Sequence, residues 1–382
     1  MARQLARDDY TIGWVCALAV ELTAAQEMLD EEHQDLPQDA DDINVYTLGR
    51  IGKHNIVLAA LPAGLMGIAS ATAVAQQMRF TFRSIRFGLM VGIGGGVPST
   101  QADIRLGDVV VSLPEKGHGG VIQYDFGKAT PSGFEPSGFL NAPPPILLAA
   151  VTKLRAAFDR GRSLFPQHLA RFESLPKFVR ESAGDDVLFE ADYVHQGQQY
   201  DCTFCKADRL VLRQPRDDAT PLIHYGTVAC GNQVIRDGQT REMVSSEFNG
   251  VLCFEMEAAG LMNNTLPCLV IRGICDYADS HKTKKWQPYA SAAAAAFAKD
   301  LLSYIPLTLV PASQSVKYPF QGTSTTNPVR KPGGLSDQER HKTVQSTSNV
   351  AYSNRQIEAL LGGMGQWCED SRPRKEKAIL PD

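Results

Sequence analysis

Two acidic stretches contain the residue types that chemistry on a small molecule would need. Glu255 and Glu257 follow a short apolar, strand-like run at residues 251–254, and Asp276 follows a second apolar run at residues 267–274. The second run is typical of a buried parallel strand. Because ligands of open α/β sheets bind at the carboxyl ends of the strands, we expect both acidic stretches beside one ligand. Each acid alone is also explained as a helix-start or turn-capping residue.

A third acid lies near the N-terminus. Residues 10–18 predict a strand and residues 20–29 predict the helix that this strand leads into, with Glu21 at the junction. An acid in the first turn of a helix interacts favourably with the helix dipole, so Glu21 by itself needs no further explanation. Its place after a strand nevertheless puts it at the same kind of position as the other acids.

A glycine-rich segment follows the strand that we predict at residues 85–91. It spans residues 92–98 and includes Gly94 and Gly95. Several glycines in a row allow a backbone to approach a flat ligand closely. The segment is not a dinucleotide-binding fingerprint, because no G-x-G-x-x-G pattern leads directly into a helix.

Three sequence stretches resemble one known family. FEMEAAG and VIRGICDYAD contain the acids named above, and ALAVEL contains Glu21. They resemble the nucleoside phosphorylase and nucleosidase superfamily, above all methylthioadenosine/adenosylhomocysteine nucleosidases and the nucleosidase-like domains of fungal NLR-type proteins. The similarity covers about residues 10–305 in the same order. It implies an α/β fold of three layers, with a central mixed twisted sheet flanked by helices.

The resemblance also implies roles for the acids in cleaving a purine N-glycosidic bond, a reaction with an oxocarbenium-like sugar at its transition state. Asp276 would protonate the leaving base, and Glu257 would stabilise the sugar while Met256 packs on the ribose. Glu21 would align and deprotonate water. The resemblance suggests further substrate-contacting or supporting residues, which are Gly94, Gly95, Val234, Ile235, Glu255 and Arg272.

Basic residues suggest what occupies the 5′ end of the substrate. Lys116, His118 and Lys128 lie in glycine-rich and aromatic loops, and Arg236 follows the expected base contacts. Such a loop taken alone is usually a solvated hinge, and Arg236 can equally pair with Asp237. Cations of this kind also bind phosphates. Together with the fungal resemblance, they favour ATP or dATP, cleaved to adenine and a (deoxy)ribose triphosphate.

Two other functions remain open at this stage. One is a purine nucleoside phosphorylase, but Glu21 replaces the usual Gly-Asp phosphate turn, and the run Leu89-Met90-Val91 lacks the arginine found before the glycine loop in phosphorylases. The other is a catalytically silent recognition module of a fungal NLR-type immune protein. The presence of all three acids argues against this second alternative.

The composition narrows the possible partners. The chain has 382 residues, a net charge of −4 and no apolar run of membrane-spanning length. This composition predicts a cytoplasmic protein that binds neither nucleic acid nor membrane, and we expect a homo-oligomer. The eight scattered cysteines suggest reduced thiols. Cys202 and Cys205 with His195 form an incomplete zinc motif, so we expect no metal and no cofactor.

The chain divides by composition into a domain and a tail. Residues 10–306 form the expected nucleosidase-like domain, which contains an irregular insertion at about residues 161–220. Residues 307–382 are rich in Ser, Thr, Pro, Gly, Gln and charged residues, a composition typical of a disordered linker.

Overall fold

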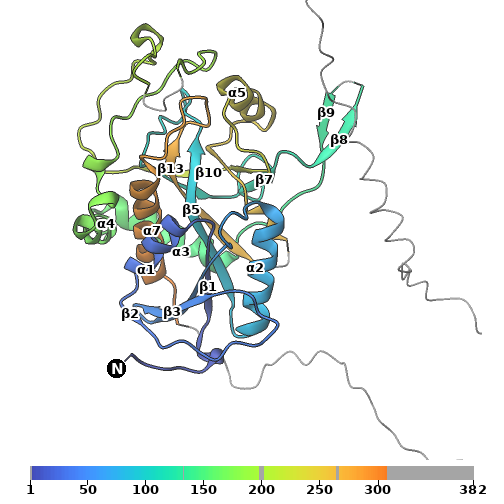
Figure 1. The fold of residues 1–382 in the computed structure, drawn as a ribbon, viewed down its shortest axis with the longest axis vertical. Helices are drawn as coiled ribbons and strands as arrows, with labels where there is room; N and C mark the ends of the chain where they lie inside the picture. Colours follow the sequence, from blue (N-terminus) through green and yellow to red (C-terminus); the bar gives the residue numbers. More distant parts are fainter. Residues whose placement is uncertain (1, 132, 198–201, 264–265, 308–382) are drawn as a thin grey trace, which may run out of the picture. The chain divides into compact units, whose positions relative to one another are not determined.

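The central feature of the fold is a mixed sheet of eleven strands, seen in a computed structural model that describes residues 2–131, 133–197, 202–263 and 266–307 (Figure 1). Its four central strands are parallel to one another, in the order β13 (Cys268–Asp276), β5 (Phe87–Gly96), β1 (Ile12–Cys16) and β4 (His54–Ala60). Every residue of β1 and β13 is buried. Such continuous burial arises when both faces of a sheet are covered.

Shorter strands extend this centre. Next to β4 are the antiparallel strands β3 (Tyr46–Ile51) and β2 (Glu31–Glu32). Beyond β13 are β6 (Val109–Ser112), which is antiparallel to it, and β10 (Ile223–Gly226). The remaining strands of the sheet are β7 (Val121–Gln123), β11 (Val228–Cys230) and β12 (Cys253–Glu255). A separate hairpin of β8 (Gly127–Thr130) and β9 (Gly133–Pro136) extends away from the sheet (Figure 1).

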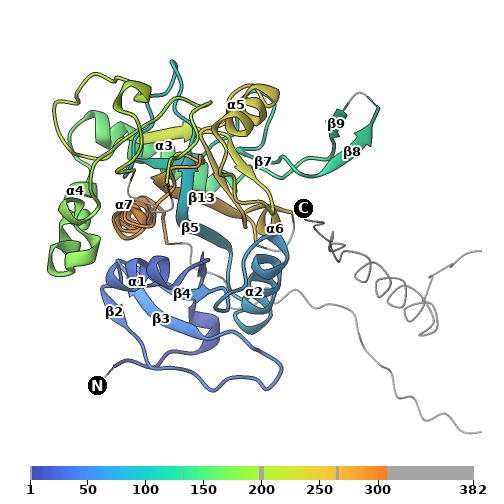
Figure 2. The ribbon, with the colours of Figure 1, turned by 45° about the horizontal axis from the view of Figure 1, so that its top comes forward.

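Helices cover both faces of the sheet (Figure 2). On one face, Trp14 of β1 belongs to an apolar cluster with residues of α1 (Ala19–Glu27), α3 (Pro145–Asp159), α4 (Phe165–Ala170) and α7 (Gln287–Ser303). On the other face, Val15 belongs to a cluster with α2 (Ile68–Thr81) and α6 (Ala259–Met262). A further helix, α5 (Gly238–Glu247), follows the short strand β11. The predicted α/β class, a mixed sheet flanked by helices, is confirmed.

Two details differ from the expectation. The glycine segment after residue 91 is a continuation of β5 to Gly96, and so it belongs to the sheet. The strand before Glu255 is antiparallel to β5, and β5 separates it from β13. The two acidic stretches therefore approach each other across β5 and are not on neighbouring strands.

The structure describes most of the predicted insertion and almost none of the predicted tail. The described residues of 161–220 include α4 and several short 3-10 helices, which irregular segments connect. The tail predicted at residues 307–382 lies outside the described residues, apart from residue 307. Within the described part of the chain, every helix is too short or too polar to cross a bilayer.

Candidate active site

A cavity of about 460 Å³ lies where β5 and β13 end and where α1 begins. Nine of the residues predicted from the sequence line it, namely Glu21, Gly94, Gly95, Val234, Ile235, Glu255, Met256, Glu257 and Asp276. Segments separated by more than 250 residues thus contribute to one cavity. Its size is within the range of small-molecule sites.

Glu21 is held by the backbone on two sides. One carboxylate oxygen, Oε2, accepts hydrogen bonds from the N–H groups of Ala17 (2.6 Å) and Leu18 (3.0 Å) at the start of α1. The other, Oε1, accepts one from the N–H of Ile93 (2.8 Å) on β5. Burial raises the pKa of Glu21, and Arg272 together with these N–H groups opposes that rise only in part. Glu21 is therefore oriented firmly and is a stronger base than an exposed glutamate.

Glycines of β5 make room for the acids. A Cβ atom at Gly92 would collide with the Glu21 carboxylate and lie 2.6 Å from Nη1 of Arg272. A Cβ atom at Gly95 would lie 2.8 Å from Oδ1 of Asp276. The segment was expected to let a ligand approach the backbone. In the structure, the lack of side chains at Gly92 and Gly95 leaves room for the carboxylates of Glu21 and Asp276.

Arg272 lies at the centre of a buried charge cluster. Its side chain is fully buried, and Nη2 donates a hydrogen bond to Glu255 and lies 3.7 Å from Oε2 of Glu257. Burial alone would lower the pKa of the Arg272 guanidinium, but Glu255, Glu257 and Glu21 outweigh burial and raise it. Glu255 also accepts hydrogen bonds from the N–H groups of Glu257 (3.0 Å) and Ala258 (3.0 Å). Arg272 and Glu255 thus fix the segment that carries Glu257.

Glu257 has an unusual protonation equilibrium. Its pKa is raised from 4.5 to about 7, chiefly by burial; Glu255 and Glu21 also raise it, and Arg272 opposes the rise. Its Oε1 accepts a hydrogen bond from the N–H of Gly67 (3.3 Å), at the start of α2. The next N–H, that of Ile68, donates to Asn232. These N–H groups at the start of α2 therefore bind the protein's own side chains.

Asp276 lies at an irregularity in the sheet. The pairing register of β13 with β5 shifts between Ile274 and Asp276, which is typical of a β-bulge and can redirect a side chain at a functional site. Oδ1 of Asp276 accepts a hydrogen bond from the N–H of Ala278 (2.9 Å). Oδ2 lies 2.9 Å from Nζ of Lys282. Burial alone would lower the pKa of Lys282, but Asp276 outweighs it and raises that pKa.

The basic residues expected at the 5′ end do not line this cavity. Nζ of Lys116 donates a hydrogen bond to the backbone oxygen of Asn249 (2.9 Å), and His118 lines a separate hollow of about 890 Å³. Lys128 lies on the β8–β9 hairpin. Arg236 precedes the N-cap of α5 and is not part of the lining either.

The lining also includes residues that the sequence analysis did not select. The two cations are Lys282 and Lys284, and apolar surface comes from Leu18, Val20, Met66, Ile93 and Phe254. The sequence signal for the lysines was present, because the basic run HKTKK begins at His281, two residues after Asp279. Only the fold shows that this run turns back beside Asp276.

Comparisons with known proteins show the family of this chain. The family model described as phosphorylase superfamily matches residues 11–303. A relative from Hyaloscypha variabilis, a nucleotide-binding leucine-rich repeat (NLR)-like protein, is 48% identical over 79% of this chain. The chain spans only 30% of that relative's length.

Two further relatives and one solved structure are nucleosidases by name. A 5′-methylthioadenosine/S-adenosylhomocysteine nucleosidase of Mycobacterium bovis is 25% identical over 78% of this chain and 97% of its own. The ATP nucleosidase Cap17 of Escherichia coli is 33% identical over 22% of this chain and 17% of its own. The solved 5′-methylthioadenosine/S-adenosylhomocysteine nucleosidase of Helicobacter pylori shares the fold, with a TM-score of 0.51 and 18% identity over 77% of this chain and 98% of its own.

Proposed function

This chain belongs to the phosphorylase superfamily, and on that premise we propose that it hydrolyses the N-glycosidic bond of a purine nucleoside or nucleotide. The observation that supports this most directly is the convergence of Glu21, Glu257 and Asp276 on one cavity. The reaction needs a proton for the leaving base, negative charge near the sugar and an activated water. We assign one of these tasks to each acid.

Asp276 is the proposed proton donor to the base. As the glycosidic bond breaks, its electron pair moves onto the purine ring, and protonation removes that charge. The ammonium group of Lys282, 2.9 Å from Asp276, adds positive charge at the same place. A fixed positive charge where negative charge develops lowers the barrier.

Glu257 and Glu21 are proposed to act on the sugar side. An ionised Glu257 beside Met256 stabilises the positive charge that develops on the sugar. Glu21 removes a proton from the water that attacks the anomeric carbon. Its hydrogen bonds to Ala17, Leu18 and Ile93 fix its direction.

Hydrolysis is favoured over phosphorolysis by charge. Glu21, Glu255 and Glu257 surround a single guanidinium, that of Arg272, which has no exposed surface. A phosphate dianion would be repelled by this excess of carboxylates. We therefore expect free base and free sugar to form in phosphate-free buffer, as measured by chromatography. Turnover that requires phosphate and yields a sugar 1-phosphate would establish the phosphorylase alternative.

For the substrate we propose an adenine nucleotide, with ATP or dATP as the leading candidates. Lys282 and Lys284 line the cavity, and cations there suit a phosphorylated substrate. The likeness to an ATP nucleosidase and to an NLR-like protein points the same way. The expected products are adenine and (deoxy)ribose 5-triphosphate.

Neighbouring lysines offer a matched test of this substrate class. Lys284 lines the cavity, whereas Lys285 is outside the lining. We expect Lys284→Gln to raise the KM for ATP by roughly two- to fivefold, without the same change for adenosine. Lys285→Gln should leave both KM values unchanged. An equal effect of Lys284→Gln on both substrates would rule out a contact with phosphate.

The similarity to an NLR-like protein supports a second candidate function, a module that binds a nucleotide without cleaving it. A panel of adenine nucleosides and nucleotides separates the two. Release of adenine from any member of the panel supports the nucleosidase. Saturable binding, measured by calorimetry, without release of base from any member supports the recognition module.

A further inference from the structure

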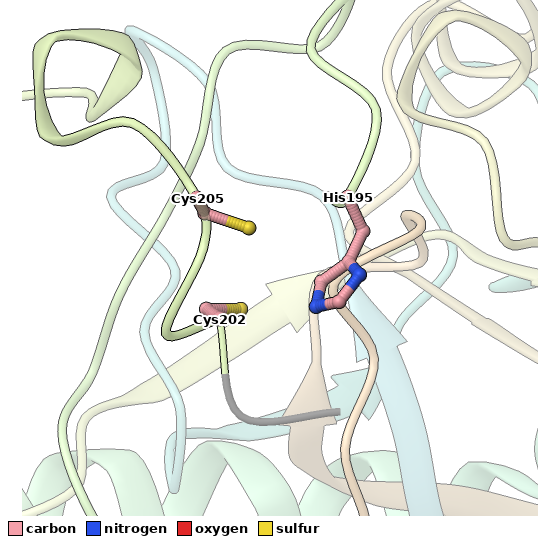
Figure 3. Close-up of side chains that lie close together, drawn as sticks. All are labelled: His195, Cys202 and Cys205. Atoms are coloured by element: carbon pink, nitrogen blue, oxygen red, sulfur yellow. The ribbon is translucent and has the colours of Figure 1, made fainter. Parts of the chain in front are cut away.

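Three side chains with strong affinity for metals meet in the insertion at residues 161–220. A ring nitrogen of His195 and the sulfur atoms of Cys202 and Cys205 all lie within 4.8 Å of one another. Figure 3 shows both sulfur atoms directed toward the same side of the imidazole ring. All three side chains are partly buried. They are separate from the cavity that contains the three acids.

The local backbone places both sulfur atoms on one side of a turn. Cys202 has a positive φ of 56°, which is uncommon for a residue with a side chain, and Cys205 donates its N–H to the Cys202 oxygen (3.0 Å). Cys202 and Cys205 form no disulfide with each other. Nε2 of His195 is buried and has no hydrogen-bond partner among the described residues. A buried nitrogen without a partner is costly unless something binds it.

We propose that His195, Cys202 and Cys205 bind a zinc ion. Two thiolates and an imidazole are ligands that zinc prefers, at about 2.3 Å from sulfur and about 2.0 Å from nitrogen. Tetrahedral zinc would bring these ligand atoms to roughly 3.5–3.8 Å from one another, so the present cluster needs only a small closure. Binding releases one proton from each thiol, and a water molecule completes the coordination.

This zinc ion would stabilise the part of the insertion that contacts the loop after Asp276. The N–H of His195 donates a hydrogen bond to Oγ of Ser280 (2.9 Å). The adjacent ring of His281 stacks on Phe189, with ring centroids 4.1 Å apart, and meets the edge of the His195 ring at 5.5 Å. The same loop carries Lys282, which pairs with Asp276. The zinc site would thus help to hold in place the loop whose Lys282 lines the cavity.

The sequence alone did not predict this site. A C-x-x-C pair with one upstream histidine provides three protein ligands, and a structural zinc site usually has four. The spacing of His195 from the cysteines gives no information about whether the chain folds back. The structure brings the three together, and the proposal stands whether or not the cavity is a nucleosidase site.

The first test is the metal content of the full chain purified in reducing buffer without added chelator. We expect about one zinc ion per chain by mass spectrometry. Replacement by Co²⁺ should produce the intense near-ultraviolet band of thiolate-to-cobalt charge transfer. Wild-type protein that contains neither zinc nor any such band after exposure to Zn²⁺ or Co²⁺ would overturn the proposal.

Single substitutions identify the ligands. Cys202→Ser and Cys205→Ser should each lose the zinc and the cobalt band. Phe204→Ala is the matched control, because Phe204 lies between the two cysteines and its side chain is 66% exposed. This control should keep about one zinc ion per chain. Equal zinc content in all four proteins would place the metal elsewhere and refute this assignment.

A chelator separates loss of metal from a general folding defect. EDTA should lower the thermal midpoint of the wild-type protein and of Phe204→Ala, and should leave that of Cys202→Ser unchanged. The competing explanation is a redox-active dithiol. A Cys202–Cys205 disulfide in protein isolated without reductant, combined with no metal uptake after reduction, would establish that explanation and exclude zinc.

Discussion

Asp276 differs from Glu21 and Glu257, the other two acids with a proposed catalytic role, in its close pairing with a lysine. Lys282 lies 2.9 Å from its carboxylate, whereas Glu21 is held by backbone N–H groups and Glu257 lies near the shared guanidinium of Arg272. The three carboxylates with a proposed catalytic role therefore have three different environments. Such differences are what separate an acid from a base in one active site.

Replacing Asp276 tests the assignment of the proton donor. Asp276→Asn keeps the shape of the side chain but cannot donate a carboxylic proton, so we expect the rate of adenine release to fall about a hundred- to ten-thousand-fold. Asp279→Asn is the same change three residues later, at a position outside the cavity lining. It should have a much smaller effect. Thermal midpoints of both variants show whether each is folded, and wild-type turnover by folded Asp276→Asn would refute the role.

The raised pKa of Glu257 predicts how the free energy of unfolding depends on pH. Its pKa is raised from 4.5 to about 7, so the folded chain still holds this proton at pH values where the unfolded chain has lost it. Stability from this group is fully present below pH 4.5 and is lost as the pH rises through about 7. The expected loss is on the order of 3 kcal/mol.

Urea unfolding at about pH 5 and about pH 7.5 measures this change. Glu257→Gln has no proton to lose, so its free energy of unfolding should fall less between the two pH values than that of the wild-type protein. An identical fall in both proteins would mean that Glu257 has an ordinary pKa. The active form needs the carboxylate, so kcat/KM should rise with pH over the same interval.

At the scale of elements, β5 organises the site. It pairs with β1, β13 and β12, and so the three segments that carry the acids are all adjacent to it. Its glycines give space to Glu21 and Asp276. The strand β5 is therefore a central strand of the sheet, and its residues Gly94 and Gly95 also line the cavity.

A methyl group on this strand should damage catalysis specifically. Gly92→Ala places a Cβ atom against the carboxylate of Glu21, and so we expect turnover to fall at least about tenfold in protein that remains folded. Gly13→Ala is the control, because its Cβ atom would meet the flexible side chain of Met78 at 2.7 Å. That change should lower the thermal midpoint without lowering turnover. Normal turnover in Gly92→Ala would show that the position of Glu21 is not critical.

At the scale of the whole molecule, one compact unit spans Met1–Pro311. The three acids, the cavity and both faces of the sheet lie within it. The expected homo-oligomer remains a prediction, which sedimentation equilibrium of the full chain tests directly.

Truncation tests whether the tail contributes to folding. A chain that ends at Pro311 should unfold at the same temperature as the full chain and release base at the same rate, because the tail composition cannot bury enough apolar surface to offset its chain entropy. The measurements are calorimetry and chromatography on both proteins. A lower thermal midpoint or an inactive truncated chain would show that the tail packs on the domain.

The sequence by itself determined the fold class and the principal acids. Buried parallel strands leave continuous apolar runs, and functional residues follow such runs directly, so Asp276 and Glu21 were recognisable by local pattern. The family resemblance identified the same residues. Glycine spacing indicated a close approach to the backbone of β5, although not which group approaches.

Only the tertiary structure decided which distant residues share the cavity. Lys282 and Lys284 line it and Lys116 and His118 do not, because loop paths depend on packing that no local pattern encodes. The antiparallel direction of β12 and the meeting of His195 with two cysteines have the same origin. Each depends on contacts between segments far apart in the chain, and the free energy of those contacts comes from the assembled core rather than from any single stretch.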